Sequence, residues 1–105
     1  MRGWVGLRLV AALLLVAPAE AAPRTYVIVM EKMMFQSVPA SVRRGDTILW
    51  ENGDMFRHTA TAKNGAFNVD LAPGAKGKTV IQKAGTVAFV CKYHPGMRGV
   101  LKVSQ

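Results

Sequence analysis

Turn-forming residues interrupt this sequence at short intervals, and this spacing limits what the chain can fold into. Glycine, proline, asparagine and aspartate recur throughout residues 39–99, so few stretches between them could hold a helix. The intervening runs are short and rich in β-branched and aromatic residues, as in residues 26–30, 47–52 and 85–90. No repeat, heptad pattern or convincing amphipathic helix occurs after residue 22. We therefore expect an all-β sandwich or barrel.

Further runs with the same character fill out the pattern. Residues 41–44, 56–62, 78–82 and 99–103 are predicted as strands. Residues 66–77 contain one proline and two glycines and are predicted as a loop.

The first 21 residues, called the leader below, have the composition of a secretory signal peptide. Arg2 and Arg8 form a basic segment before an apolar run at residues 10–17, which is followed by a small-x-small pattern at residues 19–21. An uncleaved membrane anchor is the alternative, but the apolar run is short for a membrane span. We predict a signal peptide over residues 1–21, one domain over residues 22–105, and a bacterial periplasmic location without stable membrane insertion after cleavage.

Basic residues outnumber acidic residues by 14 to 6 in the full chain. Without the leader, 12 basic and 5 acidic residues remain, which gives a net charge of about +7. This excess favours long-range attraction toward acidic partners. Nucleic acid is not expected as a partner, because the chain is predicted to be exported and has no basic-aromatic binding motif.

Cys91 is the only cysteine, so it cannot form an internal disulfide. An intermolecular disulfide, a reactive thiol and a metal ligand remain open. The neighbouring residues favour the metal ligand, since His94 and Met97 lie within the same seven residues, 91–97. Thiolate, imidazole and thioether together suit copper. The segment lies between two predicted strands and contains Pro95, as expected of a rigid ligand loop.

His58 is the only other histidine, and strand periodicity allows it to reach Cys91. The alternation in residues 56–62 places His58 on the same face as Phe56 and two alanines, while Cys91 shares the core face of its strand with Phe89. The two side chains could then meet between two sheets. A purely structural histidine is the alternative at position 58.

Two segments resemble the cupredoxins, the family of small blue copper proteins. Residues 91–97 have the pattern Cys-x-x-His-Pro-x-Met and are followed by Arg-Gly-Val-Leu-Lys-Val, as in the copper loop of short-loop cupredoxins. Residues 50–59 resemble the segment that carries the first copper-ligating histidine of this family. At position 59, this chain has threonine where asparagine is common. The resemblance covers residues 26–104.

This resemblance implies a cupredoxin-like Greek-key β-sandwich that binds one type 1 copper ion. The implied metal ligands are His58, Cys91, His94 and Met97, with Met97 in the axial position. Met55 is the only rival for that axial position, and Asn52 is a candidate for bracing the site. The implied function is transfer of single electrons through Cu(I)/Cu(II), without enzymatic activity, because four protein ligands leave no open position on the metal.

The implied partner is a redox protein with an acidic surface: a cytochrome, dehydrogenase or reductase. We expect the chain to act as a monomer, with His94 as the electron port. Arg57, Lys92 and Arg98 lie near the ligands in sequence and could steer such a partner.

Two other function classes remain open. A periplasmic copper carrier or resistance protein could use the same ligands, and the pair Met33-Met34 could form a Cu(I)-trafficking surface. A secreted β-sandwich adhesion module without metal is the third class.

Overall fold

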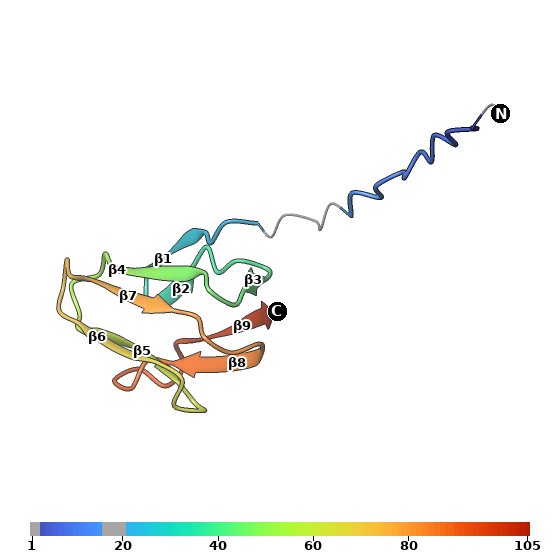
Figure 1. Cartoon of the computed structure of the whole chain (residues 1–105). Helices are drawn as coiled ribbons and strands as arrows, with labels where there is room; N and C mark the ends of the chain where they lie inside the picture. Colours follow the sequence, from blue (N-terminus) through green and yellow to red (C-terminus); the bar gives the residue numbers. More distant parts are fainter. Residues whose placement is uncertain (1–2, 16–20) are drawn as a thin grey trace.

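The computed structural model describes residues 3–15 and 21–105 (Figure 1). Residues 3–15 of the leader form no helix or strand, and most of the predicted cleavage pattern at residues 19–21 lies outside the described residues. Within the described ranges, no helix has both the length and the apolar character needed to cross a membrane.

In the part of the chain that the structure describes, nine strands form two sheets, which confirms the predicted all-β class. The four-stranded sheet has the order β2 (Met34–Gln36), β1 (Thr25–Glu31), β4 (Thr47–Asn52), β7 (Lys76–Val80). The five-stranded sheet has the order β3 (Val42–Arg43), β9 (Arg98–Ser104), β8 (Gly85–Val90), β5 (His58–Ala62), β6 (Asn68–Leu71). Only the β1–β4 and β3–β9 pairs are parallel.

The prediction of a loop over residues 66–77 is wrong, because this segment contains β6 and the start of β7. Residues 68–71 are mostly polar, and only Leu71 among them is buried. They form a strand because they pair antiparallel with β5 along the edge of the sheet. Backbone pairing of this kind depends on tertiary context rather than on local propensity.

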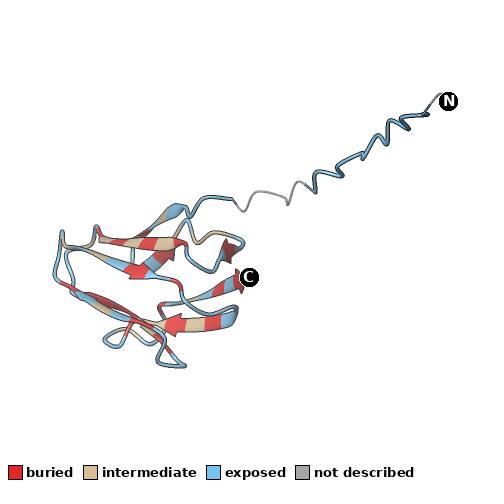
Figure 2. Ribbon diagram, viewed as in Figure 1, coloured by how far each residue is buried: buried red, intermediate tan, exposed pale blue. Residues whose placement is uncertain are grey.

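Buried residues alternate with more exposed ones along several strands (Figure 2). In β4, the inward residues Ile48, Trp50 and Asn52 are buried, and in β8 the inward residues include Phe89. The Trp50 ring lies 5.3 Å from the Phe89 ring between centroids, in an edge-on arrangement. Gly99 of β9 lies directly over the Phe89 ring, where a Cβ atom would overlap the ring carbons. The alternation predicted for Phe89 and Cys91 is confirmed, since both side chains are fully buried.

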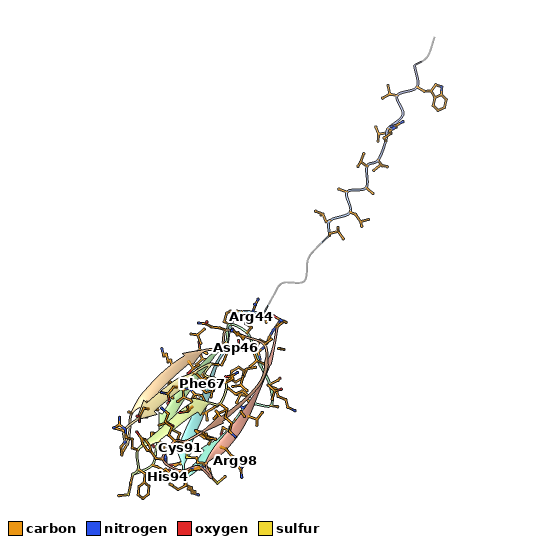
Figure 3. The ribbon with its side chains drawn as sticks, turned by 90° about the horizontal axis from the view of Figure 1, so that it is seen from below. Arg44, Asp46, Phe67, Cys91, His94 and Arg98 are labelled. Carbon is orange, nitrogen blue, oxygen red and sulfur yellow. The ribbon has the colours of Figure 1, made fainter. Side chains whose placement is uncertain are left out.

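The strands run between two opposite ends of the sandwich, called poles below. The ligand pole carries the loops at residues 53–57 and 91–97 and the turn between β1 and β2. The leader pole carries the turns at residues 44–46, 63–67 and 81–84, and the chain enters β1 there from residues 21–24. Figure 3 shows Cys91 and His94 at one end of the sandwich and Arg44 and Asp46 at the other.

Candidate metal centre

Cys91 follows the last residue of β8 and is fully buried at the ligand pole. Its backbone N–H donates to the Met97 carbonyl at 2.9 Å, and the Met97 N–H donates to the His94 carbonyl at 2.8 Å. These two bonds close residues 91–97 into a compact loop, with a four-residue turn at its tip. The loop brings Met97 back beside Cys91, where it is only 3% exposed.

His58 begins β5 and is fully buried against the sulfur of Cys91. Its Nδ1 atom lies 3.7 Å from Cys91 Sγ, although the two residues are 33 positions apart in sequence. A nitrogen at about 2.0 Å and a thiolate at about 2.3 Å from one metal ion, at a trigonal angle, lie about 3.7 Å apart. The observed spacing therefore fits two ligands of a single ion.

Asp54 determines which nitrogen of His58 faces the sulfur. His58 Nε2 lies 2.7 Å from Asp54 Oδ2, so the Nε2–H donates to the carboxylate and Nδ1 keeps its lone pair. Burial alone would raise the pKa of Asp54, but the Met33 N–H, the His58 ring and the Lys32 N–H outweigh this effect and lower the pKa. Asp54 is therefore a carboxylate at neutral pH, as expected for a group that orients a metal-binding imidazole.

His94 approaches from the solvent side of this pair. Its ring is half-buried, and its centroid lies 5.1 Å from that of His58. Two imidazoles that bind one metal ion at about 2 Å hold their centroids about 5 Å apart. Within residues 3–15 and 21–105, however, no three His, Cys, Asp or Glu side chains already enclose an ion-sized site. The fold thus preforms the His58–Cys91 pair and places His94 at its mouth.

The two methionines near the site differ in exposure. Met97 is buried beside Cys91, whereas Met55 is 89% exposed. A thioether that binds a buried ion must itself face the interior, so the burial favours Met97 over Met55 as the axial ligand.

Thr59 ties the two ligand segments together. Its backbone N–H donates to Cys91 Sγ at 3.3 Å, and its hydroxyl oxygen accepts the Lys92 N–H at 2.8 Å. The side chain is fully buried. Threonine here therefore still links β5 to the loop at residues 91–97, although the family more often has asparagine at this position.

Asn52 braces the loop at residues 53–57, as the sequence predicted. Its amide nitrogen donates to the carbonyls of Phe56 and Leu71, at 2.8 and 2.9 Å. Its amide oxygen accepts the Asp54 N–H at 3.0 Å. These bonds fix the segment that carries both Asp54 and His58.

Sequence reasoning did not identify Asp54 or Asp70. Asp70 of β6 accepts from Arg57 Nε at 2.8 Å and from the Tyr93 hydroxyl at 2.9 Å, so it holds the residue that precedes each histidine. Burial alone would raise the pKa of Asp70, but the hydrogen bonds from Tyr93 and Arg57 outweigh this effect, so the pKa is lowered. For Asp54, the position four residues before His58 was an available signal. For Asp70 there was none, because its contact with Tyr93 crosses 23 positions.

Exposed apolar side chains lie next to His94 in space and in sequence. The Phe56 ring lies 6.1 Å from the His94 ring between centroids, and both Phe56 and Pro95 are exposed. Phe56, Pro95 and the exposed Met55, which adjoins Phe56 in sequence, are called the apolar rim below.

Comparison with known proteins identifies what the chain resembles. A family profile described as the cupredoxin-like domain matches residues 6–103. An amicyanin from Paracoccus versutus is 29% identical over 90 residues, which cover 80% of this chain and 68% of the relative. The amicyanin from Paracoccus denitrificans is 29% identical over 93 residues, which cover 83% of this chain and 71% of the relative.

Solved structures give the same result for the fold. A copper(I) form of an amicyanin mutant superimposes with a TM-score of 0.68 at 25% identity, and covers 81% of this chain and 87% of that chain. A second, reduced amicyanin mutant has a TM-score of 0.68 at 24% identity, with the same coverage.

Proposed function

Because this chain belongs to the cupredoxin-like family, we propose that it carries single electrons between redox partners in the bacterial periplasm through one type 1 copper ion. The proposed ligands are His58, Cys91, His94 and Met97. The observation that carries this proposal is the buried approach of His58 Nδ1 to Cys91 Sγ at 3.7 Å, with His94 and Met97 supplied by the adjoining loop. The likeness to amicyanins supports it.

The chain's own contribution is to hold the ligands in one arrangement. Copper, when bound, supplies a one-electron couple between its two oxidation states. Asp54 keeps His58 in the tautomer with a free Nδ1, and the Thr59 N–H points at the sulfur. Asn52 fixes the loop behind them. A site braced in this way changes little in geometry when its charge changes, which is what fast electron transfer requires.

The protein is an electron carrier and not an enzyme. Four protein ligands leave no open position at which a substrate could bind the metal. The half-buried His94 within its apolar rim is the proposed electron port, and a monomer would meet a cytochrome, dehydrogenase or reductase there. Of the three basic residues nearest the proposed ligands in sequence, Arg57 is paired with Asp70, so Lys92 and Arg98 are the two left to attract an acidic partner beside His94.

The test is the visible and electron-spin-resonance spectrum of the Cu(II)-loaded chain. We expect intense blue or green absorption that disappears on reduction and is lost in Cys91→Ser. Met97→Leu should alter the spectrum, whereas Met55→Leu, at an 89% exposed position, should leave it unchanged. A pale Cu(II) complex that is the same with and without the thiol would refute the proposal.

A copper carrier is the second candidate, favoured by the exposure of several methionines. Met34 is 58% exposed and Met55 is 89% exposed, and thioethers bind Cu(I). The two functions differ in what leaves the protein. A carrier should pass Cu(I) to a chelator readily, whereas an electron carrier should keep the metal through repeated oxidation and reduction.

A further inference from the structure

The net positive charge of the domain is concentrated at the leader pole, away from the candidate copper site. Six basic residues lie on the strand ends and turns of this pole, and all six are exposed. They are Arg24, Arg43, Arg44, Lys63, Lys83 and Lys102. This group is called the basic pole below, and Figure 3 shows one member, Arg44, far from His94.

Among residues 21–105, Asp46 is the only acidic residue at this pole, so it offsets at most one of the six positive charges. Its side chain is 3% exposed and accepts the backbone N–H groups of Arg24 and Arg43, at 2.9 and 2.8 Å. Among residues 21–105, every ion pair seen lies at the opposite pole: Arg57–Asp70, His58–Asp54 and Lys76–Glu51. The basic side chains of the leader pole therefore face solvent without carboxylate partners in the described structure.

The ligand pole is close to neutral by comparison. Five basic residues there face four acidic ones. The basic residues are Lys32, Arg57, Lys76, Lys92 and Arg98, and the acidic residues are Glu31, Glu51, Asp54 and Asp70. The molecule thus has a strongly positive end and a nearly neutral end that carries the copper ligands.

The chain enters the domain at the positive end. Residues 21–24 lead into β1 beside Asp46, and the leader therefore joins the basic pole (Figure 1). A domain delivered across a membrane by this leader has its basic pole nearest to that membrane at the moment of export. Because the leader and the basic residues lie at the same pole, the membrane surface is the expected binding partner of this pole.

We propose that the basic pole docks on the anionic phospholipid headgroups of the membrane across which the leader directs the chain. The ligand pole then faces away from the membrane. Each basic residue near an anionic surface strengthens binding about fivefold. The six-residue strand β4 spans about 20 Å. The ligand pole therefore lies more than two Debye lengths, each about 8 Å, from a surface that touches the basic pole.

Docking in this way is peripheral and needs no insertion of the domain. It would keep the carrier close to the membrane and leave His94 free to meet a partner. It also gives the excess charge a role that does not depend on an acidic redox partner, since the charge is remote from the electron port.

The test uses two triple variants that remove the same number of charges. Arg24→Gln/Arg43→Gln/Arg44→Gln neutralises the basic pole, and Lys32→Gln/Lys76→Gln/Arg98→Gln neutralises three positions at the ligand pole. Binding of the exported protein to vesicles of phosphatidylglycerol and phosphatidylcholine is measured by flotation at low and at physiological ionic strength. Any apolar contribution from a retained leader is common to both variants, and thermal melting confirms that both are folded.

We expect the basic-pole variant to bind anionic vesicles on the order of a hundredfold more weakly than the parent, and the ligand-pole variant to bind nearly as tightly. The difference should shrink as salt is added. Equal weakening of both variants, or equal binding of the parent to pure phosphatidylcholine, would overturn the proposal. Failure of the parent to bind anionic vesicles would also overturn the proposal, and would favour an acidic protein as the binding partner of the basic pole. No copper is needed, so the result is independent of the electron-carrier proposal.

Discussion

A single carboxylate, Asp54, sets the orientation of His58 and also holds the neighbouring hairpin. It accepts hydrogen bonds from the N–H groups of Lys32 and Met33 and from His58 Nε2. Lys32 and Met33 both have positive φ angles, 53° and 61°, which side-chain-bearing residues seldom adopt. The carboxylate thus compensates an unfavourable turn and orients His58, a proposed copper ligand, at the same time.

Asp54→Asn should weaken copper binding by about 10–100-fold, because an amide offers one acceptor oxygen where three donors converge. The measurement is competition with a Cu(I) chelator. Glu51→Gln is the matched control, since Glu51 lies at the same pole but pairs with Lys76. If both variants lose affinity equally, Asp54 acts only through net charge and not through the orientation of the imidazole.

A second residue-scale prediction concerns Thr59. Thr59→Val keeps the shape but leaves the Lys92 N–H without its acceptor, so the free energy of unfolding should fall by about 1–3 kcal/mol. Thr59→Ser keeps the hydroxyl and should lose about 1 kcal/mol or less, from the missing methyl group. Urea unfolding of the two variants measures the difference. A serine variant as unstable as the valine variant would show that the methyl group, not the hydrogen bond, matters.

At the scale of elements, the position of the loop at residues 91–97 depends on how closely β9 approaches the Phe89 ring in the core. The loop leaves β8 at Cys91 and returns into β9, whose Gly99 pairs with Phe89. Because Gly99 has no side chain, the Phe89 ring can lie against its backbone and fill the space beneath Trp50. The position of the loop therefore depends on a small residue two positions after Met97.

Gly99→Ala should reduce the free energy of unfolding by about 1–3 kcal/mol, because the new methyl group would overlap the Phe89 ring. Gly96→Ala is the matched control in the same loop region, since a Cβ atom there meets nothing within 4 Å. It should change stability by no more than about 0.5 kcal/mol. Denaturant unfolding checks both. Equal effects would mean that the Phe89 ring can move aside without cost.

At the scale of the molecule, the parts that sequence could and could not predict separate by the range of the interactions. The placement of Phe89 and Cys91 on the same, buried face is a local property of one strand and was predicted correctly. Strand β6 was missed because its polar residues form a strand only by pairing with β5. Asp70 was missed as a bracing group because it acts across 23 positions, to Tyr93. Asp54 lies only four positions before His58, but its contact with Lys32 crosses 22 positions and could not be predicted. The separation of charge between the poles likewise exists only in three dimensions.

One carboxylate at the leader pole, Asp46, contributes to how the stability of the molecule responds to acid. Asp46 joins the entry of β1 to the end of β3, through the N–H groups of Arg24 and Arg43. Burial would raise the pKa of Asp46, but these two hydrogen bonds and the nearby arginine charges lower it below its ordinary value of 3.8. In the unfolded chain, the carboxyl therefore binds a proton at a higher pH than in the folded chain.

Stability from Asp46 is thus fully present above pH 3.8 and is lost as the pH falls through the lower folded pKa. Asp46→Asn should destabilise the protein at neutral pH, where the carboxylate has two backbone donors. Below pH 3.8, the stability of the variant should fall less steeply than that of the parent. Urea unfolding from neutral to acid pH measures both curves. At neutral pH the curves should run parallel, and a variant that retained the full acid slope would show that other carboxyl groups cause the acid sensitivity.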